Sequence, residues 1–456
     1  MQGPQEPLIS RPMSWRRRWK WLGPLAATGG GAILVAGVLL WAHTAATPSS
    51  AYHYRFQRLP RGAVKQALQR EIEFYQARLT YDPNSGLNLA SLASAYLRMA
   101  RVTGDLSWYL LAEQAAQRSV ASLPFQNSGA LIVLAKVAEA RHNFDEAIRL
   151  AHLAGIDDAL SIVVTSNLAM GHVDEAARAA ATLVDGSPSL GDYTLRALAD
   201  MAQGRDDDAV IDFQQALAVE EADEVATSAW TRTLFGRLYY RRGHPDRARL
   251  LYEEALQILP QYALALSNLA ELEIRQSQYR LAEEHLTQIV TITKASPNVY
   301  DHVLFRGLAR LKELEGDSMG AEKFWLQAEE RLRQDAASGK FGHRRELARL
   351  LLERGRPQDI AEVLRLMEQE IRIRQDADTL DVYAWALTRA GRWSDAREVM
   401  KRALRWGFRD ARFFYRAAAI EQSLGDPAQA RQFIQRAQET DPAFDEKARL
   451  TSGLGY

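Results

Sequence analysis

Small residues recur along this chain at intervals of 34 positions. Ala248 and Ala282 are 34 residues apart, as are Ala396 and Ala430. Around these alanines, amphipathic segments alternate with turns built on Gly-Asp, Gly-His or Asp-Pro. A helix-turn-helix unit of about 34 residues can bury its apolar face only against neighbouring units, so such units form a stack. The spacing therefore predicts an all-α solenoid.

The pattern is clearest in residues 230–260. Small residues stand where the two helices of a pair must approach, aromatic residues stand beside them, and a proline ends the second helix: Gly236, Tyr239, Ala248, Tyr252, Ala255 and Pro260. With Phe235 ahead of Gly236, this segment resembles the consensus of the tetratricopeptide repeat. Similar series run through Ala396 and through Ala430.

The resemblance implies a right-handed superhelical solenoid of about ten helix-turn-helix repeats over residues 62–443. Looser units surround Ala147, Ala176 and Ala209, and the unequal intervals between them predict a locally irregular superhelix. A helical-repeat fold of another kind is the alternative. Residues 444–456 form a C-terminal tail, whose charged start is expected to cover the last apolar face.

Ahead of the repeats, a basic segment precedes an uncharged one. Residues 1–21 contain five cationic side chains, all between positions 11 and 20. Residues 22–42 carry no charge, and as a helix they would span about 31 Å, close to the thickness of the hydrocarbon core of a bilayer. We predict a transmembrane signal anchor at 22–42 and a linker at 43–61. Export followed by signal cleavage near Ala46 is the alternative.

The distribution of basic residues also predicts an orientation. Cationic side chains are concentrated before residues 22–42, which favours a cytoplasmic N-terminus and an extracytoplasmic solenoid. The high arginine and alanine content, with degenerate repeats, suggests a bacterium. The predicted location is therefore the bacterial inner membrane, with the solenoid facing the periplasm.

Composition argues against several kinds of chemistry. Lys plus Arg number 57 and Asp plus Glu number 57, so no global charge excess favours nucleic acid. Cysteine is absent, which removes thiolate nucleophiles and cysteine-rich metal sites. The nine histidines are scattered, and no glycine-rich phosphate loop occurs. We predict no cofactor, no metal and no nucleic-acid partner.

One string matches a catalytic pattern. Residues 316–320, Gly-Asp-Ser-Met-Gly, satisfy the Gly-x-Ser-x-Gly motif of serine hydrolases. That motif needs a strand before its serine, because the strained strand-to-helix turn exposes the hydroxyl. The sequence before Ser318 has a helical pattern instead, so we expect Ser318 in a turn between two helices. A serine hydrolase is only a remote alternative.

The resemblance also implies where a partner binds, since the first helix of each tetratricopeptide pair lines the concave surface. The repeat register directs nine side chains towards that surface: Trp230, Arg237, Tyr240, Asn268, Arg306, Arg310, Arg345, Arg349 and Trp385. Guanidinium groups form strong, directional hydrogen bonds with carboxylates, so we expect an acidic peptide or chain terminus as the ligand. The alternative is that these arginines are solvated and pair with Glu271, Glu313 and Glu315.

These patterns together predict a non-enzymatic scaffold. It would bind partner proteins through the concave face of a membrane-tethered solenoid, in cell-envelope assembly, secretion or export. The alternative is a structural membrane protein that forms a homo-oligomer and has no dedicated peptide groove. Charge reversal at Arg306 and Arg310 is expected to remove partner binding only under the first hypothesis.

Overall fold

The computed structural model describes residues 52–293, 298–338 and 343–455. Apart from one isolated β-bridge between Asp105 and Asn298, the regular elements in these ranges are helices, which confirms the predicted all-helical class. In chain order they are α2 (Ala63–Tyr81), α3 (Gly86–Thr103), α4 (Leu106–Ser122), α5 (Ser128–Ala140), α6 (Phe144–Ala154), α7 (Ile156–Met170), α8 (Val173–Leu183), α9 (Leu190–Ala202), α10 (Asp206–Ala218), α11 (Val225–Arg241), α12 (Pro245–Ile258), α13 (Ala263–Arg275), α14 (Tyr279–Thr293), α15 (Asp301–Leu314), α16 (Ser318–Ser338), α17 (Arg344–Arg354), the 3-10 helix η2 (Pro357–Asp359), α18 (Ile360–Glu370), α19 (Ala377–Arg389), α20 (Trp393–Leu404), α21 (Ala411–Ser423), α22 (Pro427–Thr440) and α23 (Glu446–Thr451).

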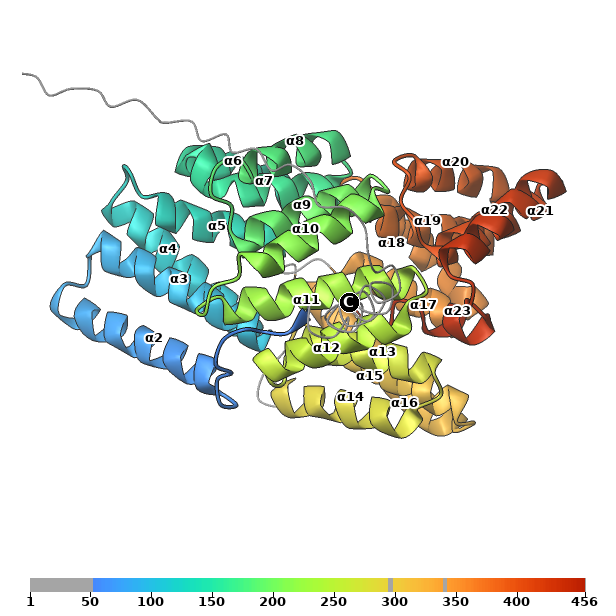
Figure 1. The fold of residues 1–456 in the computed structure, drawn as a ribbon, viewed down its shortest axis with the longest axis horizontal. Coiled ribbons are helices and arrows are strands. Elements are labelled where there is room, and N and C mark those ends of the chain that lie inside the picture. Colours follow the sequence, from blue (N-terminus) through green and yellow to red (C-terminus); the bar gives the residue numbers. More distant parts are fainter. Residues whose placement is uncertain (1–51, 294–297, 339–342, 456) are drawn as a thin grey trace, which may run out of the picture. The chain divides into compact units, whose positions relative to one another are not determined.

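From α3 onward the helices form pairs (Figure 1). Helix α3 packs against α4, α5 packs against α6, and the alternation continues to α21 and α22. The first helices of successive pairs also contact one another, from α3 to α15 and again from α17 to α21. The first helices therefore share one side of the stack, as the repeat pattern predicts.

Gly236 on α11 shows why small residues recur in these pairs. A Cβ atom at this position would lie 2.5 Å from Cε1 of Tyr252 on α12, closer than atoms can approach. Any larger residue would push the two helices apart. The turn between them ends at Gly243, whose φ of +73° is a conformation that glycine adopts without strain.

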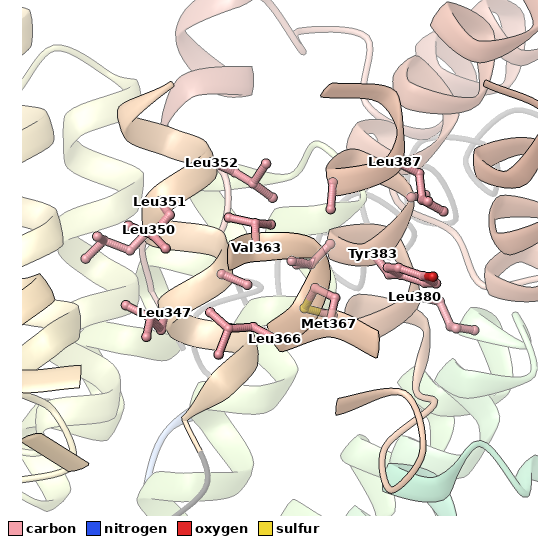
Figure 2. Packing of buried hydrophobic residues seen from close by; sticks show 14 of the residues in the cluster. Leu347, Leu350, Leu351, Leu352, Val363, Leu366, Met367, Leu380, Tyr383 and Leu387 are labelled. Carbon is pink, nitrogen blue, oxygen red and sulfur yellow. The ribbon is translucent and has the colours of Figure 1, made fainter. Parts of the chain in front are cut away.

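The hydrophobic core is a series of clusters between successive helices, and Figure 2 shows one of them. Leu347 and Leu351 of α17 belong to the same buried cluster as Val363 and Met367 of α18 and Leu380 of α19. Similar clusters lie between earlier helices. This arrangement is typical of a repeat array, in which each unit is buried by its neighbours.

Turns of early repeats contact turns of late repeats. The Nδ2 atom of Asn298 donates a hydrogen bond of 2.7 Å to the carbonyl of Thr103, 195 residues away in the chain. The backbone N–H of Gln375 donates to the carbonyl of Ala169 at 2.9 Å. The later helix pairs thus return to contact the earlier ones.

The segment before α2 is fixed to the middle of the array. A carboxylate oxygen of Glu254, on α12, accepts the backbone N–H of Tyr54 at 2.9 Å. The Nε atom of Arg232, on α11, donates to the carbonyl of Tyr52 at 2.8 Å. Both tyrosines are buried. The described part of the predicted linker at 43–61 therefore begins with a segment packed against α11 and α12.

Several sequence predictions concern residues outside the described ranges. These are the basic segment at 1–21, the signal anchor at 22–42 and the cleavage position at Ala46. Among the helices that the structure does describe, none combines the length and the apolar character needed to cross a bilayer. The membrane anchor stays a prediction.

Candidate functional site

A half-open cavity of about 220 Å³ lies among the first helices of five repeats. Its walls include four of the predicted site residues, namely Arg237 from α11, Arg306 from α15, and Arg345 and Arg349 from α17. Residues four apart share one face of a helix, which is why α17 directs both of its arginines into the same space.

The lining of this cavity carries more positive than negative side chains. Seven arginines face three carboxylates: Arg237, Arg241, Arg306, Arg345, Arg349, Arg374 and Arg412 against Glu346, Asp376 and Asp378. His302 also lines the cavity, and burial lowers its pKa well below 6.5, so the ring is neutral near pH 7. The lining therefore has an excess of positive charge.

Part of this charge is balanced by buried ion pairs. Arg237 donates to Glu271 at 2.9 Å, and Glu353 accepts from Arg306 at 2.8 Å and from Arg349 at 3.0 Å. Burial opposes ionisation of Glu353, yet the two guanidinium groups lower its pKa from 4.5 to about 2. Glu353 is therefore ionised in the folded protein at neutral pH and balances these two arginines.

Two arginines are less well balanced. Burial and the nearby Arg412 lower the pKa of Arg349 to about 10, despite its contact with Glu353. Burial also lowers the pKa of Arg241, which stacks on the ring of Phe408 at 4.9 Å. No carboxylate in the described part of the chain lies within 4.0 Å of the Arg241 guanidinium. Asp378 and Asp410 oppose this lowering from further away, so an anion placed within ion-pair distance of Arg241 would add to an attraction that is already present.

The pKa of Glu353 leads to a prediction about acid stability. Because this pKa is lower in the folded protein, Glu353 stabilises the fold above pH 4.5, and this contribution disappears as pH falls towards 2. Glu353→Gln should therefore destabilise the protein most above pH 5. The difference in unfolding free energy from wild type should shrink by about 2 kcal/mol by pH 3. Urea unfolding at pH 6 and pH 3 measures it.

Glu446→Gln is the matched control, since the Glu446 side chain is 79% exposed. Its difference from wild type should stay within about 0.5 kcal/mol at both pH values. A pH-independent effect of Glu353→Gln would contradict the assignment.

The other five predicted residues lie outside the lining of this cavity. Tyr240 is buried beneath the guanidinium of Arg237, Trp230 is half-buried, and Trp385 lies under Arg416 at 4.8 Å. Arg310 is bonded to Glu313 and stacks on Trp325, and Asn268 is 2% exposed. All nine predicted residues are thus buried or half-buried.

In the alternative interpretation of the sequence, these arginines are solvated and pair with glutamates. The ion pairs in the structure agree with that interpretation only in part. Arg237 does bond Glu271, and Arg310 does bond Glu313. Arg306 bonds Glu353 of a neighbouring repeat instead, and it is 3% exposed rather than solvated. Charge reversal at Arg306 would put two carboxylates together in the interior and disrupt the fold, so it is not a clean test of binding.

Three cavity arginines have no counterpart in the sequence prediction: Arg241, Arg374 and Arg412. Arg241 lies four residues after Arg237 on the same helix face, a spacing that could have revealed it. Arg412 is at the start of α21, and Arg374 lies in the loop between α18 and α19. These two come to the cavity only because distant repeats meet.

The last described residues of the chain also reach this cavity, which Gly453 and Gly455 line. Phe444 packs on the ring of Tyr415, centroids 5.3 Å apart, and so covers the last helix pair. Beyond it, α23 contacts α13 in the middle of the array. The tail therefore does more than cover the last apolar face, because it continues into the interior of the array.

Ser318 has none of the surroundings of a hydrolase nucleophile. It is the exposed first residue of α16 and follows helix α15 through a turn at Gly316. The Asp317 carboxylate accepts the N–H of Gly320 at 2.9 Å, which is a helix-capping contact. Within the described residues, no group of His, Asp and Glu side chains is arranged to hold a metal ion.

The stacked pairs, with first helices turned to a common interior, define a helical-repeat protein. Two segments match family models described as tetratricopeptide repeat, residues 193–261 and residues 411–444. The chain therefore contains tetratricopeptide repeats, in α9 to α12 and in α21 and α22, which confirms the resemblance seen in the sequence there. Such repeats are typical of scaffolds for protein–protein interaction and are generally non-enzymatic.

Solved structures give distant likenesses. A tetratricopeptide repeat protein from Parabacteroides merdae ATCC 43184 is 15% identical, with 65% of this chain and 98% of that chain covered and a TM-score of 0.31. A chain of the APC/C hetero-tetramer Cut9-Hcn1 is 14% identical, with 86% of this chain and 94% of that chain covered and a TM-score of 0.32. No curated protein matches this sequence.

Proposed function

We propose that this protein is a non-enzymatic scaffold that binds an acidic segment of a partner protein in the interior of its repeat array. Residues 22–42 would anchor it in a membrane, with the array facing the periplasm and serving envelope assembly, secretion or export. Tetratricopeptide repeats generally bind other proteins, which supports the general role.

One observation carries the proposal of an acidic ligand. The cavity lining has seven arginines and three carboxylates, and Arg241 has no carboxylate among the described residues within ion-pair distance. A carboxylate from a partner would meet a guanidinium whose desolvation is not yet offset by an ion pair. An acidic segment therefore complements this space better than a basic or purely apolar one.

Arg241→Met tests the proposal. Methionine keeps an unbranched side chain against Phe408 but removes a half-buried charge that has no carboxylate within ion-pair distance among the described residues, so the fold should keep its stability. Partner recovery in crosslinked co-purification from native membranes should fall about tenfold or more. Arg247→Met is the matched control, because Arg247 also stacks on an aromatic ring, Tyr239, but is exposed on α12.

Loss of the same partner from the Arg241→Met protein alone supports an interior acidic site. Unchanged recovery from both variants would contradict it. If the only crosslinked species is a second copy of this chain, the alternative of a self-associating structural protein gains support instead.

A further inference from the structure

The tail after α23 is held in the interior through its main chain. The two carboxylate oxygens of Glu271 accept the N–H groups of Gly453 at 2.8 Å and of Gly455 at 2.6 Å. Arg349 donates to the carbonyl of Ser452 at 2.6 Å. These are groups that every extended peptide carries, so the contacts do not depend on the identity of the tail side chains.

One side chain of the tail is anchored. Leu454 is 3% exposed and belongs to a buried apolar cluster with Leu266 of α13 and Leu304 of α15. Burial of the Leu454 side chain stabilises this position of the tail about as much as burial of a leucine stabilises a protein core. The site therefore combines main-chain hydrogen bonds with one apolar pocket.

The backbone at Gly453, with a φ of +81°, and the close surroundings of both neighbours of Leu454 favour glycine. A Cβ atom on Gly453 would lie 2.2 Å from Nη2 of Arg349, and one on Gly455 would lie 2.8 Å from the carboxylate of Glu271 and 3.0 Å from Oδ1 of Asn268. That Oδ1 atom is buried and has no hydrogen-bond partner among the described residues. The site thus fits the order glycine, apolar residue, glycine.

We propose that residues 452–455 are a resident peptide ligand of the interior of the array, and that the acidic segment of a partner binds by displacing them with an apolar residue that it carries between two glycines. This inference rests on the proposed function, because it assigns the same interior to the partner. The segment follows a helix of only six residues, α23, so few helical hydrogen bonds oppose its displacement.

A labelled peptide tests the resident-ligand proposal on the full chain. The probe is fluorescein-labelled Thr-Ser-Gly-Leu-Gly-Tyr, the sequence of residues 451–456, and fluorescence anisotropy measures its binding. Leu454→Asp should release the tail, because the apolar pocket cannot hold an unpaired carboxylate. The probe should then bind at least about tenfold more tightly than to wild type, where the attached tail competes at high effective concentration.

Two further variants sharpen the result. Gly453→Val should also free the site, because its Cβ atom would clash with Arg349 and its φ of +81° disfavours a branched residue. Leu450→Asp is the matched control, since Leu450 is 37% exposed on α23, and it should behave as wild type. A probe with Asp in place of Leu should bind none of these proteins.

The outcomes separate this inference from the proposed function. If both releasing variants keep their helicity but bind the probe no better than wild type, the tail is not a ligand of this site. If they bind the probe while Arg241→Met loses no partner, the tail site stands and the proposal of an acidic partner fails. If Arg241→Met loses its partner and the two releasing variants do not bind the probe, the proposal of an acidic partner stands and the tail is not a ligand of this site.

Discussion

Replacing Arg232 with alanine should lower the free energy of unfolding by about 3–5 kcal/mol. Arg232 is fully buried on α11, and its guanidinium donates to Glu220 at 3.1 Å and to Oγ of Ser228 at 2.6 Å. Its Nε atom donates to the carbonyl of Tyr52. The substitution leaves the buried carboxylate of Glu220 without its cation and frees the segment before α2. Urea unfolding of the purified full chain, followed by helical circular dichroism, measures the loss.

Arg280→Ala is the control for this prediction. Arg280 pairs with Glu284 on the outside of α14, and its side chain is 78% exposed, so its loss should cost no more than about 0.5 kcal/mol. The double variant Arg232→Met, Glu220→Leu should recover part of the stability lost in Arg232→Ala, because no unpaired charge remains buried. Equal effects of Arg232→Ala and Arg280→Ala would show that the buried ion pair does not hold this region together.

Replacing Phe235 with alanine should cost about 3–5 kcal/mol of unfolding free energy. The Phe235 side chain is fully buried on α11, and its ring stacks on Phe213 at 4.9 Å and on Tyr239 at 4.8 Å. Tyr52 meets the same ring edge-on at 5.6 Å. Truncation leaves a cavity where three elements meet, and helices fixed by their neighbours cannot close it. The midpoint of urea unfolding should fall accordingly.

Phe125→Ala is the matched truncation, since Phe125 is 81% exposed in the turn before α5. Its effect should lie within about 0.5 kcal/mol. If Phe235→Ala behaves like Phe125→Ala, the aromatic cluster on α11 does not contribute to stability as its burial indicates.

The sequence was sufficient to predict the contacts between the two helices of one repeat and the inward-facing side of each helix. Gly236 and Tyr252 are close in the chain, and their spacing alone identifies the point where α11 and α12 approach. The same register identified Arg237 and Arg349 as inward-facing, and both line the cavity. Residues on one helix face follow the helical period, so such assignments need no knowledge of distant repeats.

What the sequence could not predict depends on contacts between distant repeats. The partner of Arg306 is Glu353, which lies on the helix of the next repeat rather than one turn away on α15. Glu271 bonds Gly453 and Gly455, more than 180 residues further along. A periodic pattern reports which side of a helix is buried, but not which distant segment covers it. The sequence therefore could not predict that the nine side chains of the predicted groove are buried or half-buried.

The hydrogen bond between Asn298 and Thr103 also bears on how this chain folds. In an open array of repeats, unfolding can start at either end and spread one unit at a time, because each unit touches only its neighbours. Here the turns of early repeats are bonded to turns of late ones, so the first helices cannot fray without breaking contacts made by helices far along the chain. These bonds close very long loops, which makes their formation slow and late. We therefore expect the N-terminal repeats, although synthesised first, to reach their final stability only after the repeats around Asn298 and Gln375 have been made.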